Sequence, residues 1–222
     1  LLGDAYEYLM RNFATESGKS KGQFYTPAEV SRIMAKIIGI NNNNTNADTT
    51  IYDPICGSGS LLLKVADEAE KKITIYGQEK ESATAGLARM NMVLHDCPTA
   101  LIKCTGNSTL SDPQFTEDNG GLKQFDFIVA NPPFSSKNWS NGVYDTEGDE
   151  NTQLFSNGTD YGRFKGFGIP PTKNGDYAFL LHMLRSLKSK GKAAVILPHG
   201  VLFRGNAEAE IHDLTRKTHL ER

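Results

Sequence analysis

The fold of this chain is decided by the stretch Thr50-Ile51-Tyr52-Asp53-Pro54-Ile55-Cys56-Gly57-Ser58-Gly59-Ser60-Leu61-Leu62-Leu63. It predicts a short strand, a tight glycine turn and a helix whose first turn is apolar. Gly57 and Gly59 allow positive φ and let a ligand approach the backbone, where the N–H groups of the helix start can face it. The stretch therefore indicates a nucleotide-binding crossover, although Gly-x-Gly alone also fits a plain strand-to-helix turn.

A second predicted strand, residues 73–79, ends in a carboxylate at the spacing that such a crossover needs. Glu79 lies 22 residues beyond Gly57, close to the separation of about 20 at which an acidic residue binds ribose hydroxyls. In isolation, Glu79 also fits an exposed charged turn. Leu62 stands where a dinucleotide fingerprint requires its third glycine, which disfavours a pyrophosphate ligand. The pattern favours a shorter ligand with an adenosine end and an amino-acid end, S-adenosylmethionine.

The tetrapeptide Asn131-Pro132-Pro133-Phe134 follows the apolar run 125–130, which predicts a strand. An exocyclic amine on an aromatic base is a poor nucleophile, because its lone pair is delocalised into the ring. The Asn131 side-chain oxygen and the Pro132 carbonyl can accept its N–H bonds and favour a tetrahedral nitrogen. The two prolines fix φ and remove two backbone donors, and Phe134 offers a flat apolar face. The alternative is an Asn-Pro turn that closes a strand.

Four motifs in this order resemble the N6-adenine DNA methyltransferases, and more narrowly the modification (M) subunit of type I restriction-modification systems. They are Gln23-Phe24-Tyr25-Thr26-Pro27, Asp53-Pro54-Ile55-Cys56-Gly57-Ser58-Gly59, Gly77-Gln78-Glu79 and Asn131-Pro132-Pro133-Phe134. The resemblance covers nearly the whole chain. It implies a Rossmann-like α/β fold of the S-adenosylmethionine-dependent methyltransferases, with a mostly parallel sheet flanked by helices. It also implies methyl transfer from S-adenosylmethionine to the N6 amine of adenine in DNA, without a metal.

The resemblance assigns roles to individual residues. The catalytic residues that it implies are Asn131, Pro132, Pro133 and Phe134. The cofactor-binding residues that it implies are Gln23, Phe24, Tyr25, Thr26, Pro27, Ala28, Asp53, Gly57, Ser58, Gly59, Ser60, Glu79 and Asn107. Asn107 departs from the family pattern, because the relatives usually place an acidic residue there to bind the adenine amine of the cofactor. An amide oxygen can accept the same bond without charge.

The segment after Tyr25 also predicts the start of an amphipathic helix. Thr26 can cap it, Pro27 suits the first helical position, and Glu29 completes a Thr-x-x-Glu capping box. Apolar side chains then recur at helical spacing up to residue 38, and Gly39 ends the helix.

We expect one methyltransferase catalytic domain over residues 1–222. It comprises a helical lead-in at 1–40, a cofactor-binding and catalytic core at 50–134, a mobile loop at 135–175 and a helix-strand-helix segment at 176–222. Further helices are expected at 81–94, 177–189 and 207–219, and further strands at 101–104 and 192–197. Aromatic side chains in the loop either stack on exposed bases or tuck the loop against the core. Because this fold normally ends with two more strands, we expect the chain to be a fragment that lacks them.

Composition narrows the class of protein. The three cysteines form no Cys-x-x-Cys pair, which favours reduced thiols in a cytoplasmic protein over disulfides or zinc. No apolar run approaches the ~20 residues that cross a bilayer, so no membrane association is expected. The formal net charge of −2 predicts weak DNA binding by the chain alone, because phosphate neutralisation supplies most non-specific affinity.

The resemblance implies that a separate specificity (S) subunit provides much of the grip on DNA. The partners that it implies are DNA, the S subunit, a restriction (R) subunit and a second M subunit. Two other functions remain open from the sequence. A protein-glutamine N5 methyltransferase would present the same planar NH2 group to the tetrapeptide. A cofactor-binding assembly subunit without turnover is the non-enzymatic alternative.

Overall fold

The computed structural model describes residues 26–70, 73–143 and 160–219, together with residues 3, 5, 6, 8–10 and 12 near the start of the chain. The chain divides into two compact units. The first unit comprises Leu1–Thr109, Gln124–Asn131 and Leu187–Ile196, and the second comprises Leu110–Lys123, Pro132–Ser186 and Leu197–Arg222. Of the predicted cofactor residues, Gln23, Phe24 and Tyr25 lie outside the described residues.

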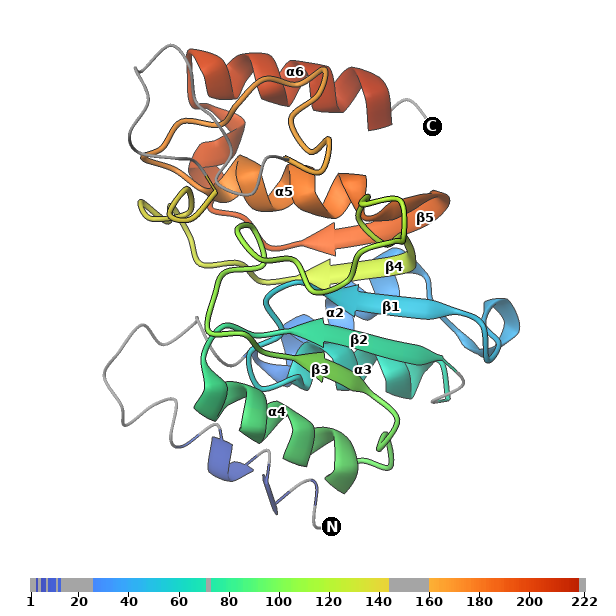
Figure 1. The fold of residues 1–222 in the computed structure, drawn as a ribbon. Helices are drawn as coiled ribbons and strands as arrows, with labels where there is room; N and C mark the ends of the chain where they lie inside the picture. Colours follow the sequence, from blue (N-terminus) through green and yellow to red (C-terminus); the bar gives the residue numbers. More distant parts are fainter. Residues whose placement is uncertain are drawn as a thin grey trace. The chain divides into compact units, whose positions relative to one another are not determined.

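The first unit is built on a five-stranded parallel sheet in the order β3-β2-β1-β4-β5 (Figure 1). The strands are β1 Thr50–Asp53, β2 Thr74–Gln78, β3 Leu101–Lys103, β4 Phe125–Ala130 and β5 Leu187–Val195. The predicted α/β class with a parallel sheet is therefore confirmed. Strands β1 to β3 proceed toward one edge of the sheet, whereas β4 lies on the other side of β1. This reversal makes the boundary between β1 and β4 the topological switch point.

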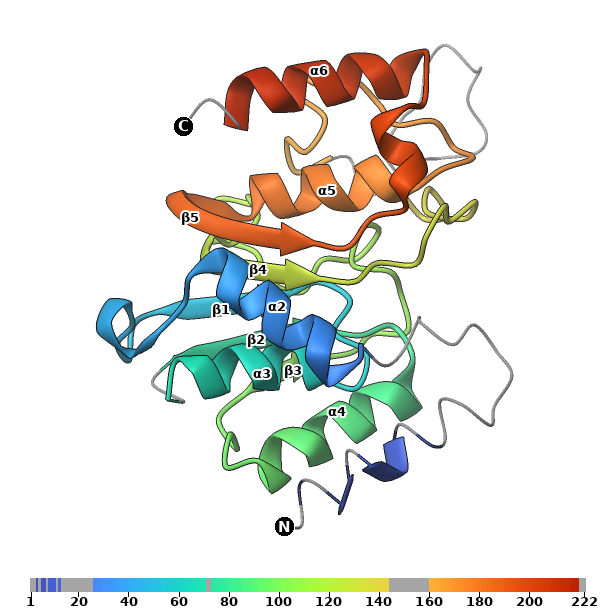
Figure 2. The same ribbon diagram turned by 180° about the vertical axis from the view of Figure 1, so that it is seen from behind.

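Helices of the first unit bury one face of the sheet in an apolar cluster. They are α2 Ala28–Ile38, α3 Ser60–Glu68 and α4 Ser82–Leu94. Helices α2 and α3 pack against each other on the same face of the sheet, which Figure 2 shows toward the viewer. The apolar first turn of α3 is fully buried, with Leu61, Leu62 and Leu63 at 2% exposure or less. The run of leucines after the glycine turn thus anchors that turn to the core.

The predicted capping box at the start of α2 is wrong. The helix begins at Ala28, Pro27 is its N-cap residue, and no side chain caps it. The Thr26 hydroxyl instead accepts a hydrogen bond of 3.3 Å from the Asn131 side-chain amide. The predicted end of the helix is confirmed, because Gly39 takes a left-handed conformation with φ +68°.

The predicted boundary between the late helix and the last strand is also wrong. Strand β5 begins at Leu187, and a register shift separates its pair with Phe125 from the pair between Lys192 and Phe127. Residues 188–191 are inserted at this irregularity. Their polar sequence lacks the alternation of a strand, so pattern reasoning extended the helix over them.

The second unit contains α5 Asp176–Arg185, the 3-10 helix η2 His199–Leu202 and α6 Ala207–His219. Trp139 is buried, its indole nitrogen donates to the Pro171 carbonyl at 2.9 Å, and its ring meets the buried Phe164 edge-on. For these two aromatics the tucked arrangement is therefore the one found. Tyr144 and Phe155 lie outside the described residues, and the mobility of residues 135–175 stays a prediction.

Within the part of the chain that is described, no helix is both long enough and apolar enough to cross a membrane.

We predict that Gly175→Ala destabilises the second unit by about 1–3 kcal/mol, because overpacking a dense core shifts its side chains. A Cβ at Gly175 would lie 2.7 Å from the Trp139 Cβ and 3.0 Å from its Cγ, close to the main chain, where the side chain cannot swing away. A Cβ at Gly205 in the same unit would meet open space, so Gly205→Ala is the control and should change stability by less than about 0.5 kcal/mol. Denaturant unfolding of the two variants measures the difference, and equal costs would contradict the packing argument.

Candidate active site

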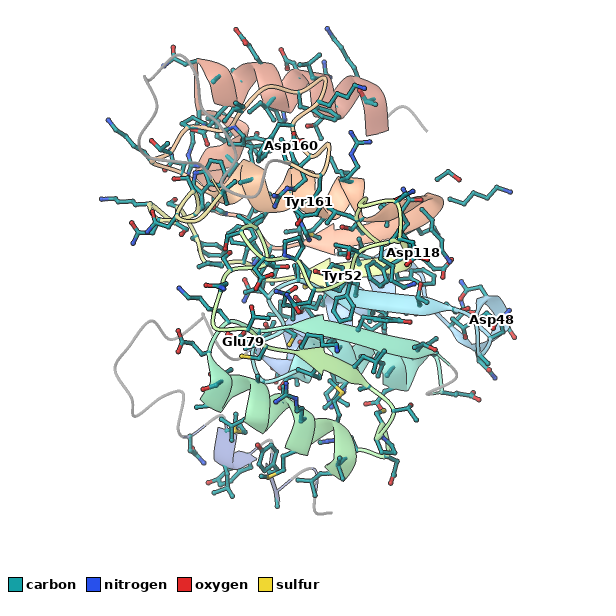
Figure 3. All side chains as sticks on the ribbon, viewed as in Figure 1. Asp48, Tyr52, Glu79, Asp118, Asp160 and Tyr161 are labelled. Carbon is teal, nitrogen blue, oxygen red and sulfur yellow. The ribbon has the colours of Figure 1, made fainter. Side chains whose placement is uncertain are left out.

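The predicted site residues of the first unit gather at the carboxyl edge of the sheet. Because all five strands run parallel, the glycine turn after β1, Glu79 after β2 and Asn131 after β4 leave from the same edge. Figure 3 labels Glu79 at the end of β2. In open α/β sheets ligands bind outside this edge, at the switch point. Asp53 and Asn131 follow the two strands that flank that point.

The glycine turn is held in one conformation by its own backbone. Gly57 and Gly59 have φ of +53° and +78°, values that glycine adopts without the steric cost of a Cβ. The Gly59 N–H donates to the Cys56 carbonyl at 2.8 Å, and the buried hydroxyls of Ser58 and Ser60 lie 2.9 Å apart in a hydrogen bond. These contacts within the chain hold the turn in its observed conformation.

Glu79 ties the glycine turn to β2. One carboxylate oxygen accepts the Gly57 N–H at 3.0 Å, and the other accepts the Glu81 N–H at 2.9 Å. The side chain is buried, with only 7% of the residue exposed. The two carboxylate oxygens have about four lone-pair sites in all, so the side chain can accept a further hydrogen bond from a ligand hydroxyl.

Burial raises the proton affinity of two carboxylates at this edge. Burial raises the pKa of Asp53 to about 8, with the Glu79 charge adding to the shift and the Ile55 N–H opposing it. Burial also raises the pKa of Glu79, against the hydrogen bonds from the N–H groups of Glu81, Gly57 and Lys80. Among the described residues, no lysine, arginine or histidine forms an ion pair with either carboxylate. The pair is therefore suited to a ligand that carries positive charge.

Asn131 is oriented by a residue far away in the sequence. Its Nδ2 donates to Thr26 Oγ1 at 3.3 Å, so Oδ1 is the side-chain atom that can accept an N–H from an amine. This contact brings Thr26 to the end of β4, and Pro27 and Ala28 follow it into α2. The contact places Thr26 beside the first residue of the tetrapeptide.

The remaining predicted residues differ in burial. Pro132, Pro133 and Phe134 continue the chain into the second unit, and Phe134 has 51% of its surface exposed. Asn107 is exposed on the loop after β3, where its backbone N–H donates to the Thr105 hydroxyl at 3.4 Å. Its position after β3 puts it at the carboxyl edge of the sheet.

Sequence reasoning missed two buried polar supports of the site. Asn91, fully buried in α4, donates from its side chain to the Ser58 carbonyl at 3.0 Å. A hydrogen-bonded chain also joins the Tyr52 hydroxyl, Thr109 and the Gln78 side chain at 3.2 and 2.9 Å (Tyr52 is labelled in Figure 3). An asparagine on the apolar face of a predicted helix is a usable signal for the first support. No local pattern indicates the second.

In the described ranges of the chain, no group of three or more His, Cys, Asp or Glu side chains is arranged to hold a metal ion.

We predict that the unfolding free energy of the cofactor-free protein falls as pH rises from about 5 to 8. In this window folded Asp53, with its pKa raised to about 8 from 3.8, keeps a proton that the unfolded chain has lost. Its stabilising contribution is therefore complete at acid pH and disappears as pH passes the folded pKa, with a slope of up to roughly 1 kcal/mol per pH unit. Asp53→Asn should flatten this slope, leaving only the smaller part from Glu79. Guanidinium unfolding at pH 5, 6.5 and 8 tests it, and identical slopes for both proteins would refute the assignment.

Comparisons with known proteins agree with this geometry. Residues 1–221 match the family model described as N-6 DNA Methylase. The chain is 36% identical over 221 residues to the type I restriction enzyme MpnII methylase subunit of Mycoplasma pneumoniae, a match covering 94% of this chain and 37% of that protein. The crystal structure of a type I restriction-modification system methyltransferase subunit from Streptococcus thermophilus superimposes with a TM-score of 0.78 at 37% identity, covering 97% of this chain and 42% of that one.

A more distant structure shares the fold. A putative class I S-adenosylmethionine-dependent methyltransferase from Listeria monocytogenes has a TM-score of 0.67 at 14% identity, covering 97% of this chain and 58% of that one. The chain spans between 34% and 43% of the length of the methylase subunits that it matches. With a family match over almost its full length, and with the glycine turn, Glu79 and Asn131 on one edge of the sheet, the chain belongs to the N-6 DNA methylase family.

Proposed function

We propose that this protein transfers the methyl group of S-adenosylmethionine to the N6 amine of adenine in DNA, as the modification subunit of a type I restriction-modification complex. The observation that carries the proposal is the parallel pairing of β1 with β4, which sets the glycine turn and Asn131 on the two sides of the switch point. Family membership supports the reaction, and the names of the matched methylase subunits support the type I system.

The residues present fit S-adenosylmethionine. In the proposed complex, Glu79 accepts hydrogen bonds from the ribose hydroxyls through its remaining lone pairs. Asp53 and the turn from Gly57 to Ser60 hold the methionine end, whose ammonium and sulfonium supply the positive charge that the two buried carboxylates lack. Asn107 accepts a hydrogen bond from the adenine amine of the cofactor. The segment Gln23, Phe24, Tyr25, Thr26, Pro27 and Ala28 completes the pocket.

The tetrapeptide then acts on the acceptor base. When bound, the cofactor supplies an electrophilic methyl group and S-adenosylhomocysteine as the leaving group. Asn131 Oδ1 and the Pro132 carbonyl accept the two N–H bonds of the adenine amine, which draws the nitrogen lone pair out of conjugation and toward the methyl group. Pro133 keeps the backbone extended, and Phe134 stacks on the flipped base. Orientation and fixed hydrogen-bond acceptors therefore account for the catalysis, and the mechanism calls for no metal.

We also propose the setting of the reaction. Residues 1–222 act as one catalytic domain in the cytoplasm, with residues 50–134 as its cofactor-binding and catalytic core. The S subunit supplies much of the grip on DNA, because a net charge of −2 offers little phosphate neutralisation, and a second M subunit belongs to the same complex. The R subunit joins them in the restriction complex.

The test of the reaction uses radiolabelled S-adenosylmethionine with DNA and with protein acceptors, with and without an S subunit. Label in DNA adenine supports the proposal. Label on protein glutamine instead, or cofactor binding without any transfer, would point to a glutamine methyltransferase or an assembly subunit and would refute it.

Asn131→Ala is expected to lower kcat by roughly 100- to 1,000-fold or more, because it removes an acceptor that acts mainly in the transition state. The Kd for S-adenosylmethionine should change by less than about 3-fold, since the glycine turn and Glu79 remain. Methylation kinetics and calorimetric titration separate the two effects. Equal loss of binding and of turnover would show that Asn131 is a structural residue.

Glu79→Gln is expected to weaken S-adenosylmethionine binding by roughly 10- to 100-fold, because one acceptor oxygen for the ribose becomes a donor. The matched control is Glu81→Gln, which neutralises the exposed carboxylate two residues away and should leave the Kd within about 2-fold. Calorimetric titration of both variants gives the comparison. Similar affinities for the two variants would rule out the ribose role.

A further inference from the structure

The residue that leaves the tetrapeptide has an uncommon backbone conformation. Ser135 has a φ of +50°, in the left-handed region that a side chain with a Cβ disfavours. Such a conformation persists only where surrounding contacts enforce it, and it occurs often at functional sites. Ser135 directly follows Phe134, so its backbone angles set the direction in which the chain leaves the ring proposed to stack on the base.

A carboxylate and a guanidinium hold Ser135 in this conformation. Its N–H donates to Asp176 Oδ1 at 2.9 Å, and its hydroxyl accepts from Arg204 Nη2 at 2.9 Å. Arg204 Nη1 in turn pairs with Asp176 Oδ2 at 2.6 Å and with Glu208 Oε1 at 2.9 Å. We call Ser135, Asp176, Arg204 and Glu208 the Ser135 clamp. All four residues belong to the second unit.

The two carboxylates of the clamp are buried and stand at helix starts. Asp176 has no exposed surface and stands in the first turn of α5, and Glu208 is 5% exposed in the first turn of α6. The amino ends of helices favour carboxylates. The Asn174 side chain also donates a hydrogen bond of 3.2 Å to Glu208, which fixes the Glu208 carboxylate. Segments that are 41 and 69 residues from Ser135 in sequence therefore converge on one strained turn.

A buried ion network of this kind is poor evidence for stability, because desolvation offsets much of its attraction. The network is better suited to selecting one backbone geometry, because each of its hydrogen bonds requires a defined direction at both the donor and the acceptor. The network lies next to Phe134, which has about half of its surface exposed. An apolar ring that is free to move gains free energy by burial. Presenting Phe134 in a fixed position is therefore what the network accomplishes.

We propose that Asp176 and Arg204 are positioning residues for the acceptor base: they hold Ser135 in its left-handed conformation and thereby fix the backbone that presents Phe134. This inference rests on the proposed function for the identity of the base. The holding of Ser135 is a separate property of the chain, and it can be measured without turnover.

The experiment compares Asp176→Ala, Ser135→Gly and the double variant in the full-length protein with its partner subunits. Asp176→Ala should lower kcat by roughly 10- to 100-fold with the cofactor Kd within about 3-fold, because misplacing a reacting group costs rate rather than cofactor binding. Glycine adopts positive φ without strain, so Ser135→Gly alone loses only the hydroxyl that accepts from Arg204 and should lower kcat less than Asp176→Ala does. In the double variant, the added Ser135→Gly change should raise kcat at least about fivefold above that of Asp176→Ala.

Hydrogen exchange supplies the readout that does not depend on activity. Asp176→Ala should raise exchange in the peptide that contains Phe134 and Ser135. Asp160→Ala is the matched control, because Asp160 also accepts two backbone N–H bonds in the second unit, from Gly162 at 2.8 Å and Phe164 at 3.2 Å (Figure 3). It should leave both that peptide and kcat unchanged. If Asp176→Ala does not fold, Asp176→Asn keeps one acceptor oxygen and should give smaller changes in the same direction.

Fluorescence of 2-aminopurine at the target position reports stacking of the flipped base, and Asp176→Ala should increase it by leaving the base less stacked. The proposal is overturned if Asp176→Ala and Asp160→Ala lower kcat equally, or if Ser135→Gly restores nothing. Raised exchange at Ser135 in a protein whose wild type transfers no methyl group to DNA would overturn the proposed function while upholding the clamp.

Discussion

The parallel pairing of β1 with β4 is the constraint on which the site depends. Ile51 lies opposite Phe127 and Tyr52 opposite Ile128, and all four side chains are buried. Because successive side chains of a strand point to opposite faces, a slip of one residue would turn this buried set over. The core therefore determines the register, and the register determines that the glycine turn after Asp53 and the amide of Asn131 leave the sheet side by side. Neither motif has chemical meaning for methyl transfer without the other.

The cofactor edge combines a rigid backbone with charges that are not balanced inside the protein. Glu79 accepts N–H bonds from Gly57 and Glu81, which orient its carboxylate. Burial raises the pKa of the neighbouring Asp53 to about 8. Without a cation beside it, Asp53 is therefore protonated at neutral pH. A positively charged ligand favours the ionised form of both groups. Stability and binding are thus opposed at this edge, as is common at functional sites.

Much of this arrangement could be predicted from sequence because it is encoded locally. The apolar run 125–130 and the 22 residues from Gly57 to Glu79 are short-range patterns, and the family motifs gave their order. The predictions that failed concern residues whose contacts are with distant segments of the chain. Thr26 does not cap α2, since its hydroxyl binds Asn131, 105 residues away. Likewise, no local signal shows that Asp176 and Arg204 meet at Ser135, or that Thr109 joins Tyr52 to Gln78. These supports depend on which elements become neighbours, and periodicity does not carry that information.

The most direct test of the proposed cofactor geometry is a crystal structure of the protein with S-adenosylhomocysteine or the amine analogue sinefungin. We expect ribose hydroxyls on Glu79, the amino-acid end along the turn from Gly57 to Ser60, and the sulfur or its replacement facing Asn131. A ligand bound elsewhere, or one whose reactive end faces away from Asn131, would contradict this geometry.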